Sequence, residues 1–518
     1  MNVMKLTTFL SASLVLTLAG QAQTNATIEL TPTANNAPAS MGDGSRNLSL
    51  NDCIDLALEK NLDLRIERYN PELSLYDLSI ARAGYDPILN ISAQNDYSKS
   101  GGSFNLFTGT NTPGSINKDH RISADIGGSL PWGMSYDFFS TATESYGSRG
   151  GSQFDSSSGQ IGVSLTQPLL RNLRADGTRL NIAVAKNRVK YSEQSLRQQL
   201  ITTVTDVETA YYELIYAREN VKVQEKSLQL AEQLFKENKK RVEVGVLAPL
   251  DEKQAESQMA ARRADRLAAQ RTLETRENAL KVLITDDYAA WHDLTLLPAE
   301  SLSATKQFYN LRDSWSSGLN QRPDLLQSKL DLERAGIQLK YYKNQVFPQL
   351  DVFGSYGYGA SGANTVELHD VFDDFQRRDL PFYSYGIKFS IPLDNLAARK
   401  RYKAGKVTVQ QAVLTLKKTE QNVMVEIDEA IKQAQSSFER VQATHEAGEF
   451  AQAALEAEQK KLENGKSTSF NVLSLQSSLT TARSAEIRAL ADYNEALTAV
   501  AQTEGSTLER RKIDVKVK

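Results

Sequence analysis

The chain has 518 residues, which is too long for one compact core at the usual roughly 100–200 residues per domain. Its formal net charge is −3, so the composition gives no electrostatic reason to expect a nucleic acid as partner. Hydrophobic residues make up 40% of the chain and the mean hydropathy is −0.43, which excludes a protein built from many membrane-spanning helices.

The N-terminus has the pattern of an export signal. Residues 1–5 are weakly basic, residues 6–19 are apolar, and Gly20 and Ala22 are the small residues expected before a cleavage site. We predict a signal peptide over 1–22; the alternative is an anchoring helix, although about 14 apolar residues are few for a bilayer. Residues 23–47 are rich in Thr, Asn, Ala and Pro without periodicity, which predicts a flexible leader.

A single cysteine, Cys53, excludes a disulfide within one chain. Its neighbours Ile54, Leu56 and Leu58 suit an apolar helix face. We therefore expect Cys53 to be a core residue rather than a reactive one.

The chain repeats itself. Residues 58–64 (LEKNLDL) resemble residues 319–325 (LNQRPDL), and at matching offsets three pairs of residues align: Pro87 with Pro348, Pro168 with Pro392, and Gly245 with Gly465. The expected organisation is a first repeat over 48–285, a linker over 286–321, a second repeat over 322–504 and a tail over 505–518.

Each repeat contains one very long predicted helix, over about 174–244 and about 396–464. Apolar residues in these segments recur at steps of 3, 4 and 7, which is typical of a coiled-coil seam. About 70 helical residues make a rod of roughly 105 Å. Shorter helices, of about 22 residues before Pro87 and over about 249–284 and 468–503, would pair with these rods end to end.

The segments about 88–167 and 349–391 alternate between apolar and polar residues and carry Tyr and Trp near their ends, as strands of a membrane β-barrel do. We count four strands in the first segment and two in the second, with a tight turn at Pro131–Gly133 and loops over 98–119, 147–159 and 359–380. A soluble antiparallel sheet is the alternative, because its alternation is the same. Four to six strands cannot close a barrel, and unpaired edges in lipid are costly, so copies of the chain must share one ring.

These features resemble the TolC-type outer-membrane factor family. The resemblance lies in the duplicated plan, in Tyr85-Asp86-Pro87 before the first strand, in Gln167-Pro168-Leu169 after the fourth, and in the tip Val244-Gly245. It implies an α+β membrane protein: a homotrimer whose β-barrel shares strands from each chain and continues into an antiparallel α-helical coiled-coil tunnel in the periplasm. It also implies contact with outer-membrane lipid and, as partners, a periplasmic adaptor (membrane fusion) protein and an inner-membrane pump of the RND or ABC type.

The resemblance assigns roles to three groups of residues. The adaptor would dock on the periplasmic tips, which here are Val244, Gly245, Val246, Leu247, Asn464, Gly465, Lys466 and Ser467. A tunnel constriction would lie at Asp251, Asn471 and Ser474, although some members have aspartates where this chain has Asn471 and Ser474. The barrel would join the helices at Pro87, Pro168, Pro348 and Pro392. The family usually has four strands per chain, whereas six would enlarge the barrel from twelve strands to eighteen.

Nothing in the sequence resembles catalytic machinery. The four histidines (His120, His292, His369 and His445) fall in a predicted loop, the linker, a loop and a long helix, without metal-ligand spacing. We therefore expect no enzyme activity, no cofactor and no nucleic-acid partner. The predicted function is a passive conduit for tripartite efflux or type I secretion; the alternatives are a non-conducting coiled-coil stalk and an envelope hydrolase. The sequence leaves the cargo open.

Overall fold

The computed structural model describes residues 44–149, 151–245, 247–363 and 368–513. The predicted signal peptide and most of the leader lie outside the described residues, as does Val246 of the first tip. Among the helices of the described part, none combines the length and the apolar character needed to span a bilayer.

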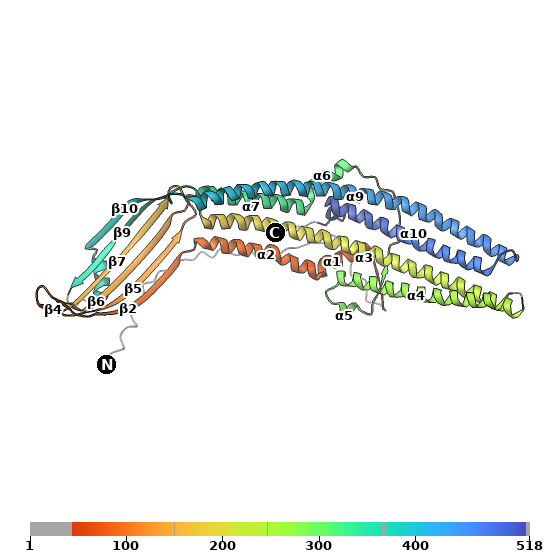
Figure 1. Cartoon of the computed structure of the whole chain (residues 1–518), viewed down its shortest axis with the longest axis horizontal. Helices are drawn as coiled ribbons and strands as arrows, with labels where there is room; N and C mark the ends of the chain where they lie inside the picture. The colour runs from red at the N-terminus through yellow and green to blue at the C-terminus, as the bar shows by residue number, and fades with distance from the viewer. Residues whose placement is uncertain (1–43, 150, 246, 364–367, 514–518) are drawn as a thin grey trace, which may run out of the picture.

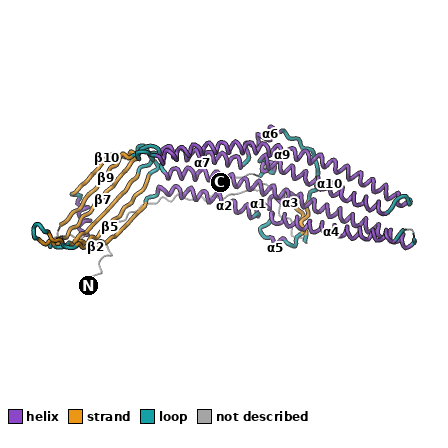
Figure 2. Tube along the Cα trace, viewed as in Figure 1, coloured by secondary structure: helices purple, strands orange, loops and turns teal. Residues whose placement is uncertain are grey.

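The molecule is elongated, with a β-sheet at one end and helices running away from it to two hairpin tips at the other (Figure 1, Figure 2). The first repeat contains the elements α1 (Leu50–Lys60), α2 (Leu62–Arg82), the 3-10 turn η1 (Ala83–Tyr85), β2 (Ile88–Ser100), β3 (Ser103–Asn105), β4 (Thr110–Thr112), β5 (Ser115–Ser129), β6 (Ser135–Arg149), β7 (Ser152–Pro168), α3 (Gly177–Glu243) and α4 (Pro249–Ile284). The second repeat contains α7 (Pro323–Gln345), β9 (Gln349–Ala363), α8 (Leu368–Arg377), β10 (Leu380–Ser390), α9 (Leu396–Glu463) and α10 (Ser469–Glu504).

Short elements lie before, between and after the repeats: β1 (Ser45–Leu48), α5 (Tyr288–Trp291), β8 (Thr295–Pro298), α6 (Leu311–Gln321) and α11 (Thr507–Arg510). Strand β1 pairs in parallel with β8, although about 250 residues separate them. The prediction of a flexible leader through residue 47 was therefore wrong at its end. The strand depends on this long-range pairing and on the burial of Leu48, its last residue, in the core. The local sequence has no periodicity that would predict a strand.

Six strands form one antiparallel sheet in the order β10-β9-β7-β6-β5-β2, so the two repeats meet where β7 pairs with β9. This is the number of crossings counted from the sequence. The strands are longer than expected, and the pairing of β6 with β7 runs from Ser135 opposite Thr166 to Arg149 opposite Ser152. Much of the segments predicted as loops, 98–119 and 147–159, is thus strand, because Ser, Thr and Gly residues there complete the ladder.

The two faces of the sheet differ in chemistry. One face carries exposed apolar side chains in paired positions, such as Ile91 beside Ala124 and Tyr356 beside Tyr383. The opposite face is mostly polar, and hydrogen bonds join neighbouring strands across it, from Ser92 to Ser123 (2.7 Å) and from Ser355 to Ser384 (2.8 Å).

Helix α8 lies inside a segment predicted as a loop, 359–380. It packs on the apolar face of the sheet, where Val371 is buried against Ala142 and Ala360. The prediction was wrong here because the helix is only ten residues long, so its apolar residues at helical spacing, Leu368, Val371 and Phe375, give a weak periodic signal between two strands. His369 therefore lies in a helix, and His120 lies in strand β5, rather than in loops.

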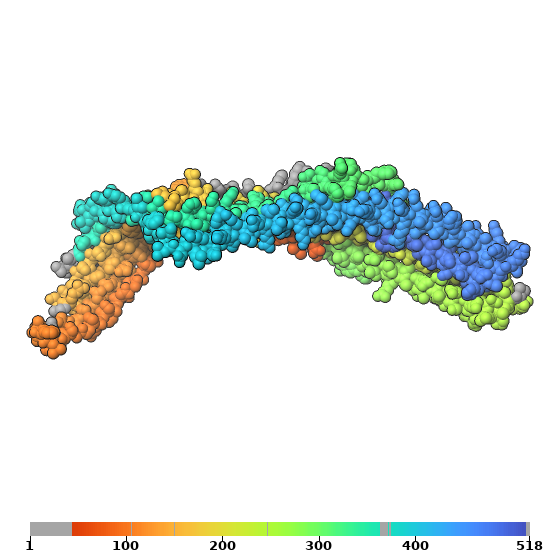
Figure 3. Space-filling model, turned by 45° about the horizontal axis from the view of Figure 1, so that its top comes forward, coloured from red at the N-terminus to blue at the C-terminus, as the bar shows by residue number. Residues whose placement is uncertain are grey.

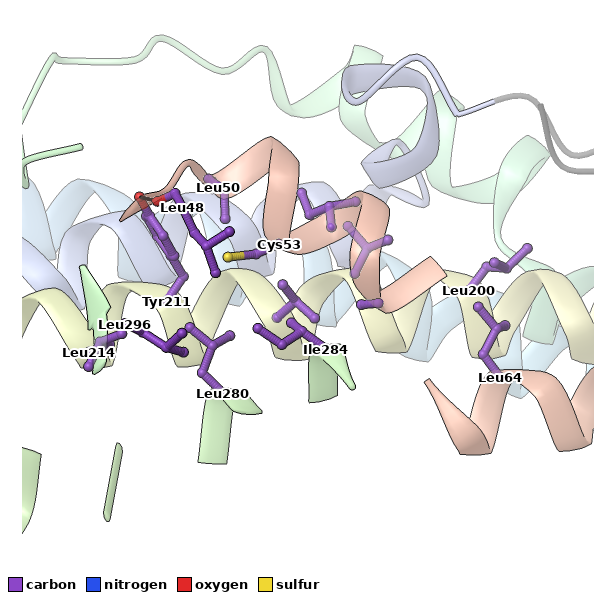
Figure 4. Close-up of a cluster of buried hydrophobic side chains, with 14 of the residues drawn as sticks. Leu48, Leu50, Cys53, Leu64, Leu200, Tyr211, Leu214, Leu280, Ile284 and Leu296 are labelled. Atoms are coloured by element: carbon purple, nitrogen blue, oxygen red, sulfur yellow. Dashed lines mark hydrogen bonds between the residues drawn. The ribbon is translucent and has the colours of Figure 1, made fainter. Parts of the chain in front are cut away.

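The largest buried cluster lies near mid-length, where α1, α3, α4 and β8 meet (Figure 4). Cys53 is fully buried in it, with Tyr211 and Leu214 of α3 nearby in the same cluster, which confirms the prediction of a core cysteine. Burial raises the pKa of the Cys53 thiol to about 12, so the residue is a poor nucleophile. The tail contributes as well, since Leu508 of α11 is buried in this cluster.

Candidate functional site at the hairpin tips and the sheet–helix junction

The first tip joins α3 to α4 through a glycine with positive φ. Gly245 has φ 76°, and its N–H donates to the carbonyl of Val242 (3.0 Å), which closes the end of α3. Nothing lies within 4 Å of a Cβ built at Gly245, so backbone conformation rather than space requires glycine here. Pro249 begins α4, where a missing N–H has no cost.

The second tip repeats this geometry between α9 and α10. Gly465 has φ 68°, and its N–H donates to the carbonyl of Leu462 (3.1 Å). Thr468 caps α10 by accepting a hydrogen bond from the N–H of Asn471 (3.4 Å). Ser467 donates to the carboxylate of Glu458, which ties the turn back to α9 and lowers the pKa of that carboxyl.

Exposed apolar side chains surround both tips. Val244 is 73% exposed, Leu250 66% and Phe470 62%. Leu250 and Phe470 were not predicted as tip residues; each follows its glycine by five positions, so the repeat alignment could have found them as a pair. The ends of the two hairpins lie side by side in the space-filling view (Figure 3).

Buried polar contacts hold the two hairpins in register. Asn238 of α3 is completely buried and accepts a hydrogen bond from Ser469 (3.0 Å), at the start of α10. Further along, three more pairs join α3 to α10: Ser227 with Thr480, Asn220 with Ser484, and Glu213 with Arg488. On α3 the last three partners lie seven residues apart, so they occupy one face of the helix.

The last of these contacts belongs to a half-buried cluster of charges. Arg488 bonds to Glu213 and pairs with Asp492 on its own helix, while Arg276 of α4 lies 3.4 Å from Glu213. Burial and the nearby Glu213 raise the pKa of Glu495 to about 7. A neutral Glu495 can donate a hydrogen bond to the carboxylate of Glu213, so the two neighbouring carboxyls need not both be charged.

The three residues predicted for a constriction do not meet within one chain. Asp251 is half-buried in the first turn of α4, whereas Asn471 and Ser474 are exposed in the first turns of α10. In the described part of the chain, no hydrogen bond or ion pair joins Asp251 to either of them. The nearest link is indirect, through Asn238, which approaches the carbonyl of Asp251 at 3.5 Å.

The four prolines lie where strands and helices meet. Pro87 follows η1, Pro168 ends β7, and Pro348 and Pro392 flank the strands of the second repeat. Asp176 organises the first junction, since it caps α3 and accepts a hydrogen bond from the hydroxyl of Tyr85 (3.0 Å).

Backbone and amide contacts tie the two repeats together at this level. The N–H of Leu169 donates to the carbonyl of Leu350 (2.7 Å), and the N–H of Asn172 donates to the side-chain oxygen of Asn344 (2.8 Å). Pro131–Gly133 forms the predicted tight turn, with a hydrogen bond from Gly133 to Leu130 (2.8 Å).

No group of three or more His, Cys, Asp or Glu side chains with the geometry of a metal site is found among the described residues. His445 instead forms a surface contact with Glu486 (2.6 Å) that raises its pKa. The structure offers hairpin tips, a two-faced sheet and a long helical body rather than a pocket with converging catalytic groups.

Comparison with known proteins identifies this architecture. The sequence model of the outer membrane efflux protein family matches residues 53–285 and 315–506. The chain is 24% identical over 339 residues to the outer membrane efflux protein BepC of Brucella suis, covering 64% of this chain and 68% of that protein. It is 22% identical over 360 residues to the outer membrane protein TolC of Vibrio cholerae, covering 68% and 78% respectively.

Solved structures show the same fold. A membrane protein from Pseudomonas aeruginosa superimposes with a TM-score of 0.66 at 19% identity, covering 92% of this chain and all of that one. The Campylobacter jejuni CmeC outer membrane channel superimposes with a TM-score of 0.65 at 16% identity, covering 93% and 94%.

The fold and the tips thus define an outer-membrane channel protein of the TolC type. The chain belongs to the outer membrane efflux protein family. It is located in the outer membrane, extends into the periplasm and serves efflux. The family is one of channels rather than enzymes, and its members work with adaptor proteins and inner-membrane pumps.

Proposed function

We propose that three copies of the chain close a shared β-barrel of eighteen strands, six from each copy, and that their helices continue it as a tunnel. Six strands are fewer than the roughly eight needed to close a barrel. Both outer strands of the sheet, β2 and β10, have one edge without a partner strand in the described chain, and every residue of β2 is exposed. Pairing β2 of one copy with β10 of the next removes these edges from lipid.

The helices support the same arrangement. Helix α2 carries an exposed apolar stripe at steps of 3 and 4, which is the spacing of a coiled-coil seam: Leu62, Ile66, Tyr69, Leu73, Tyr76 and Ile80. Helix α9, at the opposite edge of the helical layer, exposes Leu396, Val407 and Leu414. In a ring of copies, α2 of one copy would cover α9 of the next, as β2 would cover β10.

The chemistry of the sheet assigns its faces. The apolar face, with Leu89, Ile91, Tyr385 and Ile387 exposed, would contact outer-membrane lipid. The polar face, with its Ser–Ser contacts, would line a water-filled lumen through which solutes pass without meeting lipid. The chain would act as a passive conduit, with energy supplied by an inner-membrane pump of the RND or ABC type and with no cofactor.

The adaptor would dock on the tips formed by Val244, Gly245, Val246 and Leu247 and by Asn464, Gly465, Lys466 and Ser467. The exposure of Val244, Leu250 and Phe470 supports this, because apolar side chains clustered at the end of a rod suit a protein partner. Opening would be a rotation of one hairpin past the other at the tips.

Asp251, Asn471 and Ser474 would narrow the tunnel only where three copies meet at the axis. Two of these three positions carry no charge, so the constriction would attract cations less than a ring of aspartates does.

The observation that carries the proposal is the open six-stranded sheet with one apolar and one polar face. The test is conductance of the purified protein in planar lipid bilayers. Discrete single-channel steps are expected, whereas a stalk that only spaces the two membranes gives none. A second experiment tests the cargo. Export of a small dye and export of a polypeptide are each measured in cells with and without the chain. Loss of polypeptide export alone in the cells without it would favour type I secretion.

A further inference from the structure

The second repeat has a strongly basic segment directly below the sheet. One acid, Asp394, precedes the helix, but from Asn395 to Thr419 the sequence contains Lys and Arg and no Asp or Glu. Five of these cations, which we call the basic segment, fall in the first three turns of α9 and are exposed: Arg399, Lys400, Arg401, Lys403 and Lys406. The chain as a whole has a net charge of −3, so the segment is a local feature.

The basic segment lacks partners within its own chain. In the described part of the protein, none of its five residues forms an ion pair, and Lys406 only lies over the ring of Tyr402 (4.7 Å) on the same helix. At the matching end of α3, two cations do have partners: the guanidinium of Arg179 donates to the carbonyl of Pro131 (3.0 Å), and Arg188 lies 3.6 Å from Asp77.

The position of the basic segment on its helix is unfavourable by itself. The N-terminus of a helix carries partial positive charge, which acidic residues normally offset. The first turn of α9 contains no acid, and Asn395 before it makes no side-chain capping bond. Helix α3, its counterpart, has Asp176 in this place. An external anion would stabilise a cluster of cations at an uncapped helix N-terminus.

The residues around the basic segment place it next to the apolar face of the sheet. Strand β10, which precedes it, exposes Tyr385, Ile387 and Phe389 on the apolar face of the sheet. Between strand and helix, Leu393 is 97% exposed, and Leu396, the first residue of α9, is also exposed. The segment from Arg399 to Lys406 spans roughly 10 Å along the helix. Electrostatic attraction to a charged membrane surface reaches about the same distance at physiological salt. The cations are thus at the level of lipid headgroups if the apolar face lies in the bilayer.

We infer that the basic segment binds anionic phospholipid headgroups of the periplasmic leaflet of the outer membrane and fixes the depth of the channel in that membrane. The inference rests on the proposed orientation of the sheet in the bilayer. The alternative partner is a neighbouring copy of the chain, whose α2 would lie beside α9. At this level α2 offers two acids with partners of their own: Asp77 pairs with Arg188, and Glu72 accepts a hydrogen bond from Tyr76 (3.0 Å). Its last residue, Arg82, is itself basic. Lipid therefore suits the charge better.

The test measures lipid selectivity of the full-length mature protein in detergent by native mass spectrometry. Dioleoylphosphatidylglycerol and dioleoylphosphatidylcholine are titrated separately, and the apparent Kd of each is obtained. Wild type is expected to prefer phosphatidylglycerol. The double variant Lys403→Gln/Lys406→Gln should weaken phosphatidylglycerol binding about 25-fold, that is about fivefold per charge, with phosphatidylcholine unchanged.

The matched control is Lys417→Gln/Lys418→Gln, which removes two exposed cations of the same helix roughly 16 Å further from the sheet. It should change phosphatidylglycerol binding less than twofold, and 0.5 M salt should abolish the preference of wild type. Equal losses in both double variants, or no lipid preference in wild type, would overturn the inference.

Two further outcomes would also overturn it. If the Lys403→Gln/Lys406→Gln trimer dissociates in phosphatidylcholine, the cations bind a neighbouring copy of the chain rather than lipid. If the variant has altered ion selectivity but binds phosphatidylglycerol as wild type does, Lys403 and Lys406 line the tunnel rather than contact lipid. Because conductance is recorded on the same preparations, failure of lipid binding is distinguished from failure of the channel proposal.

Discussion

Helices α3 and α9 are equivalent elements of the two repeats, with 67 and 68 residues, yet they differ in burial. Helix α3 has 21 buried residues, from Ala185 to Asn238, whereas α9 has 10. Helix α3 packs against α1, α2, α4, α7 and α10, whereas α9 contacts α6, α7 and α10. Duplication thus produced two rods of one length in two environments, one inside the subunit and one at its edge. The exposed side of α9 is where the proposed neighbouring copy would pack.

The largest effect is expected when a charged residue is placed in the exposed apolar stripe of α2. Ile80→Asp places a carboxylate where the next copy is proposed to pack, and we expect complete loss of the trimer, since each interface would lose about 3 kcal/mol or more. The oligomeric state in detergent, measured by native mass spectrometry, checks this. Ser79→Asp adds the same charge one residue away, off the stripe, and should remain trimeric. A trimeric Ile80→Asp protein would refute the packing of α2 on a neighbour.

The second test compares the interiors of the two rods. Leu214 of α3 is buried in the mid-length cluster, so Leu214→Ala should lower the free energy of unfolding by about 2–5 kcal/mol. Val413 of α9 is 47% exposed, and Val413→Ala should cost less than about 1 kcal/mol. Chemical unfolding followed by circular dichroism measures both. Equal losses would show that α9 is buried as deeply as α3.

The charge cluster between α3 and α10 gives a pH-dependent test. The pKa of Glu495 is raised from 4.5 to about 7 in the folded chain, so the folded state holds a proton that the unfolded state has lost. Stability should therefore fall as pH rises from about 5 to 7 and stay low above, by about 2 kcal/mol. Glu495→Gln should flatten this profile and raise the melting temperature at pH 8. A wild type that gains stability over this range would contradict the shared proton of Glu495 and Glu213.

The smallest effects are expected at the tips, where the repeats are most alike. Gly245→Ala and Gly465→Ala force a Cβ into positive φ and should each cost about 1 kcal/mol. Gly177→Ala is the control, because Gly177 begins α3, has no positive φ and has open space around it. Thermal unfolding of the three variants measures the difference. A neutral result at only one tip would show that the two turns are not equivalent.

The regular elements were predictable because their signals are periodic and long. The two rods end within three residues of the boundaries read from the sequence, since Gly245 and Gly465 stop them and no proline interrupts them. The six strands were counted from alternation. The signals for β1 and α8 are weaker: β1 exists through pairing with β8, and α8 through packing of Val371 on Ala142 and Ala360. Such tertiary contacts leave little trace in a short segment.

The site was only partly predictable. The tip glycines were found because their positive φ demands a particular residue. The contacts that hold the hairpins together, such as Asn238 with Ser469 and Glu213 with Arg488, join residues more than 200 positions apart. Polar side chains on a coiled-coil helix usually face water, so nothing in the sequence marks these as buried. The role of the tips in adaptor docking and of Asp251 in a constriction remain predictions.

The parallel pairing of β1 with β8 closes the first repeat on itself. The N–H of Thr295 donates to Gly44 and that of Ala299 to Leu48, and the hydroxyl of Tyr211 also bonds to Leu48. All but one of the buried residues of the mid-length cluster precede residue 297. A chain threaded into the periplasm from its N-terminus can therefore assemble this cluster while the second half is still being translocated. The first repeat would then already be folded when the second repeat emerges, so β9 could pair with β7 and α7 could pack on α3.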